Sequence, residues 1–128
     1  MAKSKKPFFT RSKIWIEDAE GNMVFGSGRL KIFKAIQAKG SINAAAKDLK
    51  MGYRAVWARI NASEKRLGQP LLIKQSGGSS GGGTKLTPLA ETLMEQYEMI
   101  QNVIEKETDE RFQNALKDHL TILNHKKK

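Results

Sequence analysis

The residues best suited to chemistry lie between positions 53 and 61, where side chains that can contact nucleic-acid bases recur at helical spacing. They are Tyr53, Arg54, Trp57, Ala58 and Asn61. The guanidinium of Arg54 can donate two parallel hydrogen bonds to guanine, and Asn61 can reach an adenine edge or a phosphate. Tyr53 and Trp57 can contact thymine methyl groups or the sugar-phosphate backbone. Alternatively, Trp57 packs partly into the core and Tyr53 is a surface aromatic residue.

A helix over residues 53–67 places these side chains on one face and an apolar stripe on the other. The apolar stripe comprises Val56, Ile60 and Leu67, with Ser63 and Glu64 at its edge. The helix ends at Gly68, a residue that commonly terminates helices. This pattern is typical of a recognition helix.

A Gly/Ser-rich loop over residues 76–83 joins two short apolar strands, predicted at 71–75 and 84–87. It is not a phosphate-binding P-loop, because it ends in Gly83-Thr84-Lys85 and a strand follows it rather than a helix. A flexible linker would have a similar composition, but linkers seldom lie between two apolar strands. The segment is therefore predicted to be a wing that approaches DNA phosphates. The wing residues expected to contact DNA are Lys74, Ser79, Ser80 and Lys85, and Ser41 joins them from a helix start.

The sequence gives little indication of a catalytic site or a metal site. Cysteine is absent, so thiol nucleophiles, disulfides and cysteine-based zinc sites are excluded. His119 and His125 are six residues apart and do not share a helical face. The acidic residues at 91, 95 and 98 form an exposed stripe that solvates a helix. We expect no catalysis, no cofactor and no bound metal.

The 128 residues carry a net charge of +10, which is concentrated in two parts of the chain. Residues 1–13 hold five basic groups and no acid, and residues 27–87 hold twelve basic groups against two acids. Such clustering favours a polyanionic partner over a merely solvated surface. The chain has no apolar stretch of about 18 residues and no apolar signal core, so neither a membrane span nor export is expected. The expected location is the cytoplasm.

The elements that must position these residues follow from apolar spacing and turn residues. A β-hairpin is predicted over 13–25, and helices over 29–39, 44–49 and 53–67. Ala46 precedes Leu49 by three residues and Val56 by ten, the spacing at which two helices of a helix-turn-helix cross. Lys50 occupies the turn position where glycine is frequent. The fold class is mainly α with small β elements: a winged helix-turn-helix.

The C-terminal part is predicted to be helical and to form a homodimer. Thr87 caps a helix that begins at Pro88, and Thr108 is predicted to cap a last helix. The first helix presents the stripe Leu89, Leu93, Tyr97, Ile100 and Ile104, and the last presents Phe112, Leu116, Leu120 and Leu123. The stripe, together with the apolar face of the last helix, is the predicted dimer interface, unless the two helices fold back on each other within one chain. The predicted segments are a flexible basic arm (1–12), the DNA-binding domain (13–87) and a dimerisation segment (88–128).

Several segments resemble the N-terminal domain of ModE-type molybdate-responsive transcription regulators, a relative of the LysR-type winged helix. The most specific are the run Tyr53-Arg54-Ala55-Val56-Trp57 and the wing at 77–87, and Gly40–Ala46 and Ile60-Asn61 extend the match. The resemblance covers about residues 13–104. It implies a winged-helix fold and binding to double-stranded DNA.

Two features differ from that family. Gly52 stands where the family usually has a serine cap. Full-length members also carry β-rich oxyanion-binding domains, whereas the 24 residues from 105 to 128 are predicted to be helical. We therefore expect a stand-alone DNA-binding version that does not bind molybdate.

The leading hypothesis is a sequence-specific, ModE-like transcriptional regulator that binds DNA as a homodimer. One alternative is an architectural or RNA-binding protein that uses the same basic surface without base readout. Another is an adaptor that binds a different regulator through its C-terminal helices.

Overall fold

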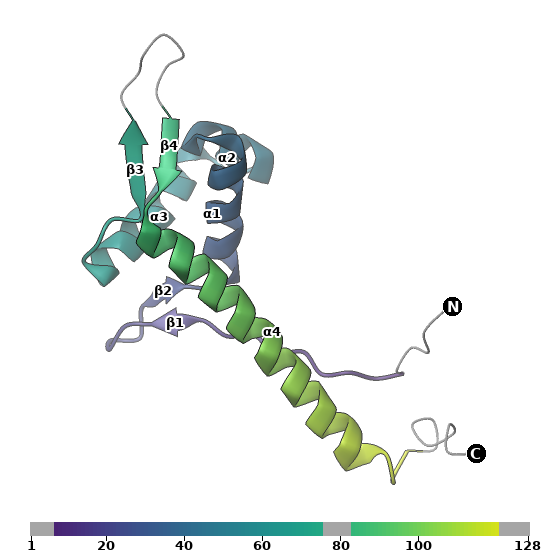
Figure 1. The fold of residues 1–128 in the computed structure, drawn as a ribbon. Helices are drawn as coiled ribbons and strands as arrows, with labels where there is room; N and C mark the ends of the chain where they lie inside the picture. Colours follow the sequence, from purple (N-terminus) through teal and green to yellow (C-terminus); the bar gives the residue numbers. More distant parts are fainter. Residues whose placement is uncertain (1–6, 76–82, 121–128) are drawn as a thin grey trace. The chain divides into compact units, whose positions relative to one another are not determined.

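The computed structural model describes residues 7–75 and 83–120. The elements are β1 (Ile16–Glu17), β2 (Met23–Phe25), α1 (Ser27–Lys39), α2 (Ile42–Leu49), α3 (Tyr53–Leu67), β3 (Leu72–Gln75), β4 (Gly83–Leu86) and α4 (Pro88–Leu116) (Figure 1). The order of three helices followed by a two-stranded wing confirms the predicted winged helix-turn-helix. None of the helices in these two ranges is long and apolar enough to cross a membrane.

The chain forms two compact units. One unit is Ile14–Tyr97, which holds the helix-turn-helix, the wing and the beginning of α4. The second comprises Met1–Lys13 together with Glu98–Lys128, of which residues 7–13 and 98–120 are described. The boundary predicted between residues 87 and 88 thus differs from the structural one, because the first turns of α4 pack into the winged-helix unit.

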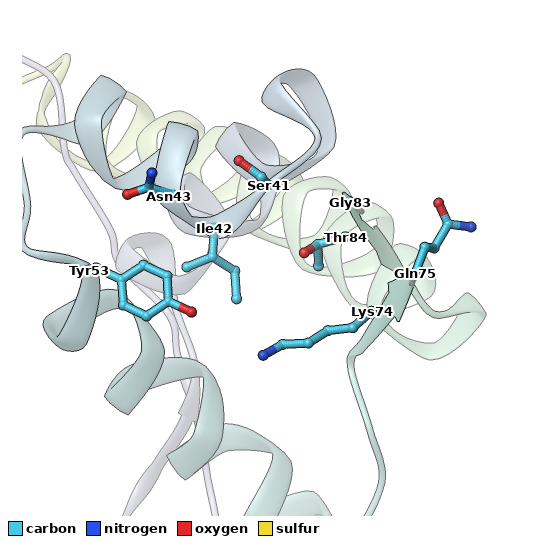
Figure 2. A pocket seen from close by; sticks show the side chains of 8 residues that line it. All are labelled: Ser41, Ile42, Asn43, Tyr53, Lys74, Gln75, Gly83 and Thr84. Carbon is cyan, nitrogen blue, oxygen red and sulfur yellow. The ribbon is translucent and has the colours of Figure 1, made fainter. Parts of the chain in front are cut away.

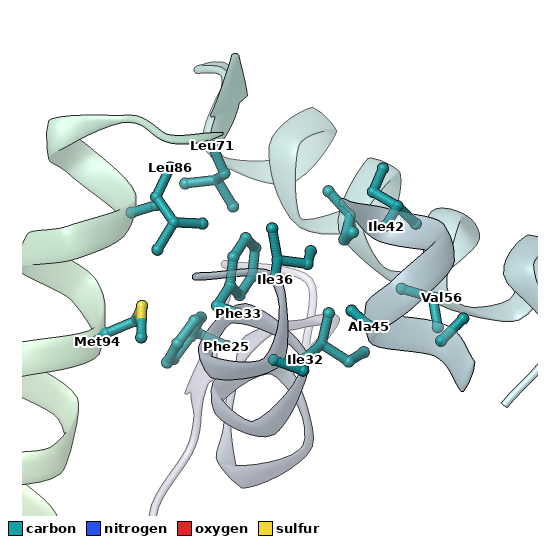
Figure 3. Close-up of a cluster of buried hydrophobic side chains, with 14 of the residues drawn as sticks. Phe25, Ile32, Phe33, Ile36, Ile42, Ala45, Val56, Leu71, Leu86 and Met94 are labelled. Atoms are coloured by element: carbon teal, nitrogen blue, oxygen red, sulfur yellow. The ribbon is translucent and has the colours of Figure 1, made fainter. Parts of the chain in front are cut away.

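The core of the winged-helix unit is an aromatic and aliphatic cluster between α1, α2, α3, β2 and the start of α4 (Figure 3). Phe33 is fully buried and stacks on Phe25, with ring centroids 5.9 Å apart. Tyr97 meets the edge of Phe25 at 5.4 Å, and its hydroxyl donates a hydrogen bond to the Ile14 carbonyl at 2.9 Å. Burial raises the pKa of the Tyr97 phenol. These contacts fix α4 against the domain up to Tyr97.

Local signals set the helix ends. Gly40 ends α1 in the left-handed conformation at φ 81°, which glycine adopts without a Cβ clash. Ser41 caps α2 by accepting a hydrogen bond from the Ala44 amide at 3.0 Å. Both helices begin two residues before the predicted starts, at Ser27 and Ile42 rather than at 29 and 44.

The turn between α2 and α3 uses a lysine where glycine would be easier. Lys50 lies at φ 58°, and its amide donates to the Ala46 and Lys47 carbonyls. A residue with a Cβ is strained in this region by about 1–2 kcal/mol. We expect Lys50→Gly to raise the free energy of unfolding by about 1 kcal/mol, measured by urea denaturation. Lys50→Val is the opposing control, because a β-branched residue should lower it; equal stability of all three proteins would contradict this account.

The wing hairpin is fastened to the end of α1. The strands pair antiparallel, with Leu72 opposite Leu86 and Lys74 opposite Thr84. The Thr84 amide donates to the Gly40 carbonyl at 2.8 Å, and a Cβ on Gly83 would approach that oxygen to 3.1 Å. Glu64 of α3 accepts from the Leu71 and Leu72 amides at 2.8 and 3.2 Å. The base of the wing is therefore positioned by both α1 and α3.

The prediction that a new helix begins at Thr108 is wrong. α4 passes through Thr108 without interruption and ends at Leu116, so the described chain does not fold back into a helical pair there. A residue that could cap a helix does not interrupt one unless a neighbouring glycine, proline or competing contact breaks the helical hydrogen bonds. No glycine or proline occurs between residues 89 and 116. Leu120 follows the helix, and Leu123 lies outside the described residues.

The described part of the predicted flexible arm is held along α4 within the second unit. The Thr10 amide donates to Asp109 Oδ1 at 2.8 Å, and Gln101 donates to the Ser12 carbonyl at 2.9 Å. Gln113 donates to the Phe8 carbonyl at 2.6 Å. The spacing of the three helix residues spreads these contacts along about three turns of α4.

Candidate nucleic-acid interface

The predicted recognition residues lie together on the outer face of α3. Arg54, Trp57, Ala58 and Asn61 line a surface hollow of about 260 Å³, which we call the helix hollow. Arg54 and Asn61 are exposed, and neither side chain makes a hydrogen bond within residues 7–75 and 83–120. Their donors and acceptors are therefore available to an external partner.

A second hollow of about 260 Å³, the wing hollow, lies between the start of α2, the start of α3 and the wing strands (Figure 2). Its lining residues are Ser41, Ile42, Asn43, Tyr53, Lys74, Gln75, Gly83 and Thr84. In Figure 2 the Lys74 side chain reaches from β3 into this space, toward the side from which Tyr53 enters. The structure thus brings the predicted residues Ser41, Tyr53 and Lys74 together.

Trp57 and Lys74 connect the two hollows. Trp57 is half-buried and packs against the core, while Lys74 Nζ lies 5.2 Å from the centre of its ring. A cation over an indole face is attracted by about 0.5–1 kcal/mol when exposed. The core interpretation of Trp57 is therefore confirmed in part, and its contact with DNA stays a prediction: one side of the ring belongs to the core and another contacts a wing lysine.

Lys85, the other predicted wing residue that the structure describes, does not line the wing hollow. Lys85 pairs with Ile73, one position away from the pair formed by Lys74 and Thr84. Because successive side chains in a strand point to opposite faces, Lys85 lies on the face of the wing away from Lys74. Ser79 and Ser80 fall outside the described residues.

Five residues of the wing hollow were not predicted to contact DNA: Ile42, Asn43, Gln75, Gly83 and Thr84. Asn43 follows the helix cap at Ser41 closely, so its position at a helix start was a usable signal. Gln75 and Thr84 belong to the hollow only because the hairpin register and the Thr84–Gly40 hydrogen bond bring the wing beside α2.

An acidic turn borders the far end of the recognition helix. Asp18, Glu20 and Asn22 share a hollow of about 470 Å³ with five residues of α3: Ala58, Asn61, Ala62, Lys65 and Arg66. The hydrogen bond from the Asn22 backbone amide holds the pKa of Asp18 below its ordinary value. The Glu20 backbone amide and the charge of Arg66 lower this pKa further. Asp18 thus remains charged and organises the turn between β1 and β2.

The arrangement is that of a helix-turn-helix whose second helix presents hydrogen-bonding side chains beside a basic wing, the geometry of a class of DNA-binding proteins. The family described as "Bacterial regulatory helix-turn-helix protein, lysR family" matches residues 28–91, half of the chain. The chain belongs to this family, and it carries a DNA-binding helix-turn-helix of the LysR/ModE type, the domain of a transcriptional regulator.

Individual relatives agree with that assignment. The chain is 42% identical over 77 residues to the transcriptional regulator ModE of Haemophilus influenzae, covering 60% of this chain and 30% of that protein. It is 31% identical over 81 residues to the DNA-binding transcriptional dual regulator ModE of Escherichia coli, covering 63% and 31%. The chain therefore spans about a third of the length of these curated relatives.

A solved structure shares the fold. The CbnR DNA-binding domain, crystallised in complex with DNA, superimposes with a TM-score of 0.51 at 26% sequence identity. The match covers 69% of this chain and 95% of that one. Within residues 7–75 and 83–120, no group of three or more histidine, cysteine or acidic residues is placed to hold a metal ion.

Proposed function

We propose that the protein is a sequence-specific regulator that binds double-stranded DNA with α3 in the major groove. The observation that carries this proposal is the pair Arg54 and Asn61, exposed and without internal hydrogen bonds on one face of α3. These are side-chain types that form bidentate bonds to guanine and adenine. The DNA complex of the similar CbnR domain supports the same use of the fold.

The wing hollow is proposed to hold the DNA backbone beside the groove. Lys74 supplies positive charge there, and Ser41, Asn43 and Thr84 supply polar side chains. Such contacts set the register of a protein on the duplex but carry little sequence information. Lys85, and Ser79 and Ser80 of the wing loop, are proposed to contact phosphates from other positions on the wing.

The biological role is proposed to be ModE-like transcriptional regulation in the cytoplasm. Its support is the similarity to proteins named as ModE regulators and, at 36% identity over 81 residues, to the molybdenum-pterin-binding protein MopB of Rhodobacter capsulatus. The absence of molybdate binding by this chain stays a prediction.

Selection of bound DNA from a random pool tests the proposal. The selected site should be bound about 10³-fold or more tightly than random DNA at the same salt concentration. An architectural protein, or one that prefers RNA, would show no such ratio, because phosphate contacts alone do not discriminate sequence.

We further propose that the protein is a homodimer through the exposed apolar part of α4. Met99, Ile100 and Val103 are 52%, 44% and 60% exposed on consecutive turns. The interface predicted from sequence shifts as a result: Leu89 and Leu93 pack against their own core, and Tyr97 is only 4% exposed. Ile104 is half-buried and borders the exposed group. Two copies of α4 would cover these apolar side chains and place two recognition helices on two half-sites.

Val103→Lys is expected to raise the dimer dissociation constant at least about tenfold, because a charge would be buried without a partner. Sedimentation velocity across a concentration series measures this change. Asn102→Lys is the matched control, since it adds the same charge at an exposed polar neighbour and should leave the dimer intact. An unchanged dimer in both variants would place the interface elsewhere.

A further inference from the structure

Three arginines gather around Ser63, outside the helix and wing hollows. Arg59 and Arg66 lie four residues before and three residues after Ser63 on α3, so all three share one helical face. Arg29, from the first turn of α1, donates through Nε to Ser63 Oγ at 3.0 Å. Ser63 is fully buried and donates in turn to the Val24 carbonyl at 2.6 Å. We call Arg29, Arg59 and Arg66 the arginine cluster.

Neutral groups hold each guanidinium of the arginine cluster in place. Arg66 donates to the Met23 carbonyl, and Arg29 approaches the Met23 sulfur at 3.9 Å. Arg59 donates to the Ala55 carbonyl of its own helix at 3.2 Å. Each side chain is thus oriented through part of its hydrogen-bonding edge, and the remaining N–H groups are left for another acceptor.

No carboxylate of the described residues forms an ion pair with the arginine cluster. The nearest acid on α3, Glu64, accepts hydrogen bonds from the Leu71 and Leu72 amides instead. Asp18 acts on Arg66 only through longer-range attraction. Burial, and then the charges of Arg59 and Arg66, lower the pKa of Arg29, the direction expected for a cation among cations.

We infer that Arg29, Arg59 and Arg66 form a binding site for a phosphate group. Guanidinium groups bind phosphate oxygens through paired, charge-assisted hydrogen bonds, and an anion would relieve the mutual repulsion of three neighbouring cations. The group can belong to free inorganic phosphate or to a DNA backbone flanking the proposed interface. The phosphate site itself depends only on the arginine cluster. That the bound phosphate belongs to DNA rests on the proposed function.

Arg59→Gln is the variant that tests the site. Arg59 is exposed and bonds only within its own helix, so its loss should not disturb packing, whereas Arg29 and Arg66 connect separate elements. Lys106→Gln removes the same charge from an exposed position on α4 and serves as the matched control. Arg59→Lys keeps the charge without the planar fork and should retain part of the effect. Far-UV circular dichroism checks that all variants are folded.

The first arm titrates inorganic phosphate against chloride at matched ionic strength and follows the thermal midpoint. Occupation of a site raises the midpoint steeply near the dissociation constant and then only with the logarithm of the phosphate concentration, whereas general exclusion of phosphate from the protein surface gives a rise roughly proportional to the concentration. We expect the logarithmic rise of the thermal midpoint in the parent protein and in Lys106→Gln, and its loss in Arg59→Gln. That result assigns the site to free phosphate.

The second arm measures DNA binding over a salt series. If a backbone phosphate occupies the site, Arg59→Gln should reduce the slope of log affinity against log salt by about one unit more than Lys106→Gln does. The inference is overturned if the two variants behave alike in both arms. If the parent protein prefers no DNA sequence, the proposed function fails, and the phosphate titration still decides the site.

Discussion

Replacing Arg54 by alanine should weaken binding to the selected DNA site by about 1–3 kcal/mol and relax the base preference at one position. Arg54 is the second residue of α3, at the end of the recognition helix that contacts bases in related folds. Because its guanidinium makes no hydrogen bond within the described residues, the variant removes an external contact and leaves the fold intact. Titration of the selected site and of random DNA across a salt series measures the effect.

Two variants separate base readout from charge. Arg54→Lys keeps the charge but not the bidentate fork, so it should lose most of the base preference and little of the affinity for random DNA. Lys85→Ala should weaken binding to both DNAs alike and reduce the salt slope by about one unit. If Arg54→Ala weakens both DNAs equally, Arg54 is a phosphate contact and the proposed position of α3 in the groove is wrong.

Phe33→Ala should lower the free energy of unfolding by about 3–5 kcal/mol, the largest stability effect expected in the chain. Phe33 is fully buried at the centre of the cluster in Figure 3, stacked on Phe25. Its truncation removes apolar contacts and leaves a cavity between α1 and the start of α4. Urea denaturation followed by circular dichroism gives the free energy.

Phe9→Ala is the control for the loss of an aromatic ring. Phe9 is exposed in the N-terminal segment, so its replacement should change stability by no more than about 0.5 kcal/mol. Phe33→Leu should be intermediate, because leucine refills part of the volume. A cost for Phe33→Ala as small as that of Phe9→Ala would contradict the central place of Phe33 in the core.

Several features of the fold were predictable because their causes lie within a few residues. The bounds of α3 are those predicted, since its apolar spacing and Gly68 act locally. Ser41 was predicted at a helix start and Lys50 at the turn position, and both act through backbone groups of the adjacent helices. The same local logic failed at Thr108, because a potential cap has no effect when the helix on both sides continues.

The side chains of the candidate interface were also predictable as a set, but their surroundings were not. Helical spacing alone puts Arg54 and Asn61 on one face of α3. The position of Lys74 over Trp57 depends on the wing, which is fastened by the Thr84–Gly40 and Glu64–Leu71 hydrogen bonds. No spacing rule connects residues that far apart along the chain.

By itself, then, the sequence determined the winged helix-turn-helix order, the residues that share the outer face of α3 and the basic character of the protein. The tertiary structure decided which apolar residues of α4 are buried, with Tyr97 in the core and Val103 exposed. It also decided that Arg29 joins Arg59 and Arg66 around Ser63. The physical reason is range: helix periodicity and capping act over one or two turns, whereas burial and charge clustering depend on packing between distant segments.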